Sequence, residues 1–172
     1  MINKQNSKQV IISDIDNTLI FNTRALKKAK TAIAGNISIN TIDIDAKKLI
    51  FYLACTKFHN FFYPNLKLIK ILKTKKKPII LVSARMDILR EETEQMLAFY
   101  KIPYNKLILR KSKFFNIRGF AWKAYLLNKL KSLYHQIDFY EDDLRTLKKC
   151  IIKNNNINYF HVTKQKIYKF KI

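Results

Sequence analysis

Residues 9–19 read Gln-Val-Ile-Ile-Ser-Asp-Ile-Asp-Asn-Thr-Leu, and the expected fold follows from them. Residues 9–13 are mostly apolar and β-branched, which is typical of a strand that is buried in a parallel sheet. Asp14 and Asp16 follow at the carboxyl end of that strand. Because ligands of open α/β sheets bind outside the carboxyl ends of the strands, we expect both carboxylates to border a binding crevice.

A cation would explain why Asp14 and Asp16 lie so close together in the sequence. Two carboxylates two residues apart repel each other unless a proton or a cation separates them. Mg²⁺ is a hard cation that prefers oxygen ligands, so it meets this need. A polar turn that only ends a strand is the alternative, and the pair alone does not decide between the two.

Strands and helices are expected to alternate along the rest of the chain. Short apolar runs predict four more strands, at residues 79–82, 107–109, 137–140 and 159–162. Apolar residues at helical spacing predict helices at residues 24–34, 46–60, 64–72, 87–100, 120–133 and 143–153. We interpret residues 35–45 as a loop or a small hairpin, and the tail 164–172 as an edge strand or a flexible arm. The alternation favours an α/β fold, a Rossmann-like three-layer sandwich with a mostly parallel central sheet.

The length of 172 residues fits one domain, so we expect a single domain over residues 1–172. The stretch between Asp16 and Ile79 is longer than a crossover between two parallel strands requires. Approximately residues 22–63 are therefore expected to form an enlarged flap or a small helical cap insertion over the crevice. Most of the aromatic residues there should fill a core, and one or two could stack on a nucleic acid base.

The composition excludes several classes of protein. Only two glycines occur, which excludes the P-loop and the dinucleotide-binding motif, because both need clustered glycines. Two cysteines provide neither a disulfide framework nor a Cys-rich zinc site. No apolar run approaches the roughly 20 residues of a membrane helix, and the first strand begins too early for a targeting peptide. We therefore expect no membrane association and no secretion, and a cytoplasmic location or an organellar matrix.

The chain carries 34 Lys and Arg against 12 Asp and Glu, a formal net charge of +22. One interpretation is a polyanionic partner such as a nucleic acid. Another is genome composition, because the frequent residues Lys, Ile and Asn have A- and T-rich codons. Under both interpretations the scarce acidic residues are informative. Five of the twelve form two clusters, which are Asp14 with Asp16, and Glu141 and Asp142 with Asp143.

Polar residues also accompany other predicted strands. Ser83 ends the second strand, where its hydroxyl could donate to a phosphate oxygen. Glu141, Asp142 and Asp143 close the fourth strand, and adjacent acids after a buried strand are costly without a cation or partners. Lys123 lies early in a predicted helix. The acidic triplet therefore favours a metal site at the same edge of the sheet.

The order of these elements resembles the haloacid-dehalogenase-like (HAD) phosphohydrolase superfamily. Its pattern is matched by Asp14-x-Asp16-x-Thr18, then Ser83, then Lys123, then the acidic triplet, and it covers roughly residues 9–162. The resemblance implies a Mg²⁺-dependent phosphatase in which Asp14 is the nucleophile, Asp16 is the general acid and base, and Thr18 fixes the loop.

The same resemblance implies the ligands of the metal. Mg²⁺ would be held by Asp14, by the backbone carbonyl of Asp16 and by an acidic pair from the triplet. Glu141 with Asp142 and Asp142 with Asp143 both fit that pair, so Asp142 belongs to either register. Glu141 with Asp142 departs slightly from the usual Asp-Asp.

A narrower resemblance lies in the middle of the chain. Arg90-x-x-Thr93-x-x-Met96-Leu97, followed by Ile102-Pro103-Tyr104-x-x-Leu107-x-x-Arg110, resembles the 3′-phosphatase module of polynucleotide kinases. That module commonly has Trp where this chain has Met96. The resemblance implies a phosphorylated nucleic acid end as substrate. The residues that would bind it are Ser83, Arg85, Arg110 and Lys123.

Three functions therefore remain open. The leading one is removal of a 3′-phosphate from a nucleic acid end. The second keeps the chemistry and takes a nucleotide or another small phosphate ester as substrate, and a closed cap pocket would favour it over an open groove. The third is a noncatalytic RNA-binding component of a ribonucleoprotein assembly, such as an organellar ribosome, built on a HAD fold.

Overall fold

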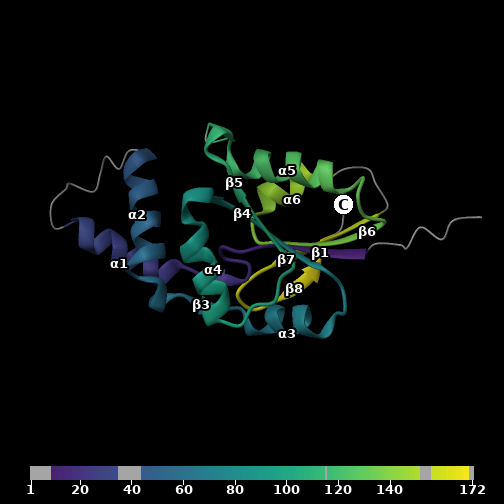
Figure 1. The fold of residues 1–172 in the computed structure, drawn as a ribbon, viewed down its shortest axis with the longest axis horizontal. Helices are drawn as coiled ribbons and strands as arrows, with labels where there is room; N and C mark the ends of the chain where they lie inside the picture. The colour runs from purple at the N-terminus through teal and green to yellow at the C-terminus, as the bar shows by residue number, and fades with distance from the viewer. Residues whose placement is uncertain (1–8, 35–43, 115, 152–155, 171–172) are drawn as a thin grey trace, which may run out of the picture.

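The computed structural model describes residues 9–34, 44–114, 116–151 and 156–170, and its centre is a six-stranded sheet (Figure 1). In their order across the sheet, the strands are β5 (Lys106–Arg110), β4 (Ile79–Met86), β1 (Gln9–Asp14), β6 (Gln136–Glu141), β7 (Ile157–Val162) and β8 (Ile167–Lys169). Paired strands run parallel except β7 and β8, which are antiparallel. The predicted mostly parallel sheet is confirmed, and the tail contributes its edge strand.

Helices cover both faces of this sheet, which makes three layers. α3 (Leu66–Thr74) and α4 (Arg90–Phe99) lie on one face, and α5 (Gly119–Leu130) and α6 (Leu144–Cys150) lie on the other (Figure 1). Alternate residues of β1 point into different cores. Ile11 belongs to the core on the α3 and α4 side, whereas Val10 and Ile12 belong to the core under α5 and α6. β1 is therefore buried on both faces, as its apolar run predicted.

A capping side chain explains the start of α3, and short 3₁₀ turns lie where some of the predicted helix bounds were wrong. The Asn65 side chain caps α3 by accepting a hydrogen bond from Leu68 N at 3.2 Å. The helix expected at 46–60 ends at Thr56 and is followed by η2 (His59–Phe61). The helix expected at 87–100 begins with η3 (Asp87–Leu89), and η4 (Ser112–Phe114) precedes α5.

The register of the central strands brings the predicted site residues to one edge. Asp14 of β1 pairs with Val82 of β4, and Ser13 pairs with Tyr140 of β6. Ser83 and Glu141 are the next residues of β4 and β6, so they lie beside Asp14. The expectation that Ser83 ends its strand is wrong, because β4 continues to Met86 through an irregularity in its pairing with β5.

A small hairpin follows β1 and carries two helices. β2 (Ile20–Phe21) pairs antiparallel with β3 (Tyr63–Pro64), and α1 (Thr23–Ala34) and α2 (Ile44–Thr56) lie between them in the chain. The two helices pack against each other, and α2 also contacts α4 (Figure 1). The loop or hairpin expected at 35–45 falls outside the described residues except at its end, where α2 begins. None of the described helices combines the length and the apolar composition needed to cross a bilayer.

Candidate active site

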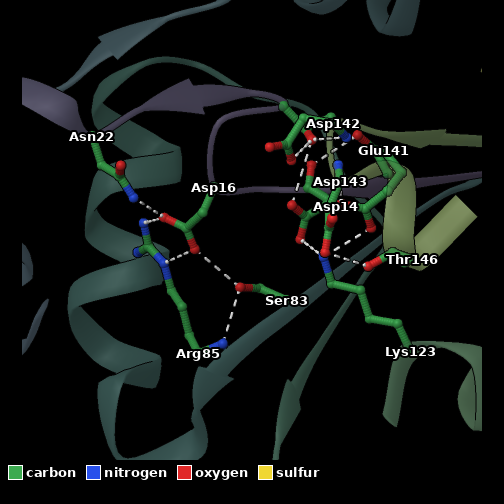
Figure 2. Close-up of polar contacts among 12 residues, drawn as sticks. Asp14, Asp16, Asn22, Ser83, Arg85, Lys123, Glu141, Asp142, Asp143 and Thr146 are labelled. Carbon is green, nitrogen blue, oxygen red and sulfur yellow. Dashed lines mark hydrogen bonds and ion pairs between the residues drawn. The ribbon is translucent and has the colours of Figure 1, made fainter. Parts of the chain in front are cut away.

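Two polar clusters lie at the carboxyl ends of β1, β4 and β6, and Figure 2 shows that Asp14 and Asp16 point into different ones. Asp14 turns toward Lys123 of α5, whose Nζ lies 2.8 Å from Asp14 Oδ1 and 2.8 Å from Glu141 Oε2. All three side chains are buried. A lysine on the buried face of a helix needs such partners, because an unpaired buried ammonium is strongly unfavourable.

Burial sets the charge balance of the first cluster. It raises the pKa of the Asp14 carboxyl to about 7, because the attraction of Lys123 only partly opposes desolvation and the nearby Asp142 and Asp16 add to the rise. Burial and the proximity of Asp14 also raise the pKa of Glu141 well above its usual range. Burial alone would lower the pKa of Lys123, but Asp14 and Glu141 outweigh it and raise it. The single ammonium of Lys123 therefore does not balance the charge of the crowded carboxyl groups of Asp14, Glu141 and Asp142.

This crowding fits a metal ion. Asp14, Glu141 and Asp142 each offer a carboxylate oxygen, and these oxygens lie within 4.8 Å of one another. Burial also raises the pKa of Asp142. An all-oxygen donor set with surplus negative charge suits Mg²⁺ better than a softer metal. These residues could therefore hold a magnesium ion.

Thr18 ties the loop after β1 to the acidic loop after β6. Its hydroxyl donates to Asp142 Oδ1 at 2.8 Å and accepts from Asp142 N at 3.1 Å. It also lies 3.4 Å from Asp14 Oδ2. Thr18 is fully buried, so these contacts hold the two carboxylates in a defined relation.

The three residues of the acidic triplet have different partners. Glu141 contacts Lys123, and Asp142 shares Thr18 with Asp14. Asp143 instead caps α6: its Oδ1 accepts from Arg145 N and Nε, both at 3.0 Å. Of the two registers left open by the sequence, the arrangement therefore favours Glu141 with Asp142 as the acidic pair.

Asp16 forms the second cluster with Arg85. Arg85 Nε and Nη2 donate to the two carboxylate oxygens of Asp16, each at 2.8 Å, and Ser83 Oγ donates at 3.2 Å (Figure 2). Asn22 Nδ2 adds a hydrogen bond at 3.0 Å. Burial alone would raise the pKa of Asp16, but the ion pair and hydrogen bonds from Arg85 outweigh it and lower it. Asp16 is therefore held in its ionised form.

The two arginines predicted to bind substrate lie away from the cleft. Arg85 is 3% exposed and lies behind Asp16, with the rings of Phe51 and Phe62 centred 5.6 and 5.8 Å from its guanidinium. Arg110 ends β5, and its Nη1 donates to the Ile117 carbonyl at 2.9 Å. Neither lines the cleft, because strand pairing and helix packing direct them elsewhere. The predicted site residues all lie in one of the two polar clusters except Arg110, which lies in neither.

A cleft of about 550 Å³ opens in front of Asp14, Ser83, Lys123 and Asp142. Several residues of its wall were not predicted from the sequence, and His161 is one of them. Its Nε2 donates to the Asp142 carbonyl at 2.9 Å, and its Nδ1 contacts the Tyr168 hydroxyl of β8. Its place near the carboxyl end of the last parallel strand was the available signal.

The affinity for Mg²⁺ should depend on Asp142 and not on Asp143. We expect Asp142→Asn to weaken Mg²⁺ binding at least about tenfold, since even indirect partners of metal sites contribute 10–100-fold. Asp143→Asn is the matched control, because Asn caps a helix as well as Asp. Isothermal titration of both variants with Mg²⁺ checks this. Equal losses in the two variants would contradict the assignment of the acidic pair.

No protein-family model matches the chain, and no curated protein matches it in sequence. A solved haloacid dehalogenase-like hydrolase from Streptococcus pneumoniae is 12% identical, with a TM-score of 0.59 over 91% of this chain and 85% of that one. The chain has the HAD-like fold. A HAD-superfamily hydrolase from Geobacter sulfurreducens is 9% identical, with a TM-score of 0.54 over 89% of this chain and 86% of that one.

The HAD-like fold also matches a chain of the Pnkp1/Rnl/Hen1 RNA repair complex. The two chains are 19% identical in sequence, with a TM-score of 0.61, and the match covers 93% of this chain and 44% of the repair-complex chain. This chain thus spans less than half the length of the repair-complex chains that it matches.

Proposed function

We propose that the protein is a Mg²⁺-dependent phosphatase that removes a 3′-phosphate from a nucleic acid end through an aspartyl-phosphate on Asp14. The observation that carries this proposal is the buried cluster of Asp14, Lys123, Glu141 and Asp142 at the mouth of an open cleft. Mg²⁺ held by these carboxylates and by the Asp16 carbonyl would neutralise charge on the phosphate.

The chemistry assigns a role to each residue. A carboxylate oxygen of Asp14 forms a bond to phosphorus while the bond from phosphorus to the leaving oxygen breaks. Lys123 and Ser83 line the cleft and would donate to the phosphoryl oxygens, Ser83 by turning its hydroxyl away from Asp16. Water then attacks the phosphorus of the aspartyl-phosphate, which frees Asp14 and releases inorganic phosphate.

Asp16 handles the protons of both steps. As held by Arg85 it is ionised and ready to take a proton from the attacking water. To protonate the leaving oxygen it must first gain a proton, which requires its ion pair with Arg85 to weaken. Arg85 therefore acts on the reaction through Asp16 and not by contact with the substrate.

The shape of the cleft supports a macromolecular substrate. Among the described residues of α1 and α2, none lines the cleft, so these helices do not enclose it. We propose these helices as a flap or cap that borders the site without enclosing it. A small phosphate ester would be expected in a closed pocket, whereas the end of a nucleic acid strand can enter an open one. The net charge of +22 adds affinity for phosphates by release of counterions.

The substrate is tested with three phosphate esters in the presence of Mg²⁺ or of EDTA. We expect phosphate release from an oligonucleotide with a 3′-phosphate, little from a 5′-phosphorylated one, and none in EDTA. Preferred turnover of a mononucleotide would move the assignment to a small-molecule phosphatase. No turnover, together with salt-sensitive RNA binding that Asp14→Asn leaves intact, would support a noncatalytic role in a ribonucleoprotein.

A further inference from the structure

A second hollow of about 330 Å³ adjoins the cleft between α5 and α6. Ala84, Lys123, Asp143 and Arg145 line both spaces, so the two are continuous. The hollow is completed by Arg118 and Phe120 at the start of α5 and by Thr146 of α6. A ligand whose phosphate lies beside Lys123 therefore has room to extend into this hollow.

Two arginines provide positive charge and hydrogen-bond donors at the hollow. The Arg145 side chain is 79% exposed, and within the described ranges its one ion pair joins Nε to Asp143 Oδ1 at 3.0 Å. Its guanidinium lies 6.0 Å from the centre of the Phe120 ring. Arg118 is exposed, and its side chain makes no hydrogen bond or ion pair with a described residue. The Nη groups of both arginines are thus available to an incoming anion.

The one acid that lines the hollow, Asp143, offsets only one of the two arginine charges. Both oxygens of Asp143 are occupied, Oδ1 by Arg145 and Oδ2 by the Thr146 hydroxyl at 3.2 Å. Guanidinium groups present donors in a fork that matches phosphate oxygens. In a nucleic acid strand, the phosphate nearest the 3′-terminal one is the phosphodiester on the other side of the same nucleoside. The hollow beside the cleft is where that group would be held.

Resting on the function proposed above, we propose that Arg118 and Arg145 form a second phosphate-binding subsite. It holds the phosphodiester that precedes the terminal 3′-phosphate, and it thereby selects polynucleotide ends over nucleoside 3′-monophosphates. The Phe120 ring beside Arg145 offers a face on which the terminal base can stack.

The test compares kcat/KM for a dinucleotide with a 3′-phosphate and for a nucleoside 3′-monophosphate. We expect the protein to prefer the dinucleotide by about tenfold or more, the order of one charge-assisted contact. In Arg118→Gln/Arg145→Gln this ratio should fall to about one. Lys67→Gln/Lys70→Gln removes the same charge from exposed positions of α3, on the opposite face of the sheet, and should keep the ratio. A ratio that the arginine variant leaves at its original value would overturn the subsite.

A binding measurement separates this subsite from the catalytic proposal. A nucleoside 3′,5′-bisphosphate carries the second phosphate on one nucleoside, so it should bind about tenfold tighter than the 3′-monophosphate, and only while the arginines are present. If no substrate is hydrolysed but this difference holds, the catalytic proposal fails and the subsite stands. If phosphate is released but the two ligands bind equally, the subsite fails and catalysis stands.

Discussion

Asp14→Asn should reduce phosphate release by a factor on the order of 10³ or more, because an amide does not form the covalent bond to phosphorus. The variant should fold normally. Asn has nearly the same volume, and it removes a carboxylate that burial and its acidic neighbours already disfavour. Steady-state phosphate release from a 3′-phosphorylated oligonucleotide, with thermal unfolding measured beside it, checks both parts.

Asp143→Asn is the control for the loss of activity at Asp14. It makes the same chemical change in the wall of the same cleft, but on a carboxylate that caps α6, whereas the described ion pairs of Lys123 are with Asp14 and Glu141. It should retain most of the turnover. An Asp14→Asn protein as active as this control would rule out Asp14 as the nucleophile.

Arg85→Met should lower the free energy of unfolding by about 3 kcal/mol, because removing one partner of a buried ion pair leaves the other charge uncompensated. The Arg85 side chain is 1% exposed and that of Asp16 is 18% exposed, so we expect the low end of the range for buried pairs. For a domain of this size the loss corresponds to about 6–12 °C in Tm. Urea unfolding and calorimetry measure it.

Two variants show whether the loss comes from the ion pair. Arg85→Met/Asp16→Asn should recover more than half of the stability, since the stranded carboxylate is gone. Arg90→Met makes the same substitution at an exposed arginine, which pairs with Glu94 one turn along α4 at 3.0 Å. That pair should contribute less than about 0.5 kcal/mol. Similar losses at Arg85 and Arg90 would contradict the role assigned to the buried pair.

The sequence predicted the fold because the signals involved are local. The apolar run at 9–13 and the one at 79–82 mark strands through burial and β-branched composition, and the helices between strands mark a parallel sheet. Parallel strands bring their carboxyl ends to one edge. That is why Asp14, Ser83 and the acidic triplet could be expected together before any contact was known.

Arg85 shows what such signals do not contain. Its position beside Ser83 is compatible with substrate binding, but β4 continues past Ser83 and turns the guanidinium toward Asp16. The same holds for Arg110, because a sequence motif gives the spacing of a residue along the chain and not the direction of its side chain. His161 had only its place near the end of a parallel strand as a signal, since its partners Asp142 and Tyr168 lie on other strands and loops.

Hydrophobic periodicity and strand ends are properties of short segments. They are therefore enough to predict the alternation of strands and helices, the edge of the sheet at which the candidate site lies and the carboxylates that gather there. The tertiary structure was needed to favour Glu141 with Asp142 as the acidic pair, to pair Arg85 with Asp16, and to join the cleft to the hollow beside Arg118 and Arg145. These features depend on side-chain directions and on distances between residues far apart in the chain, which packing of the whole domain sets.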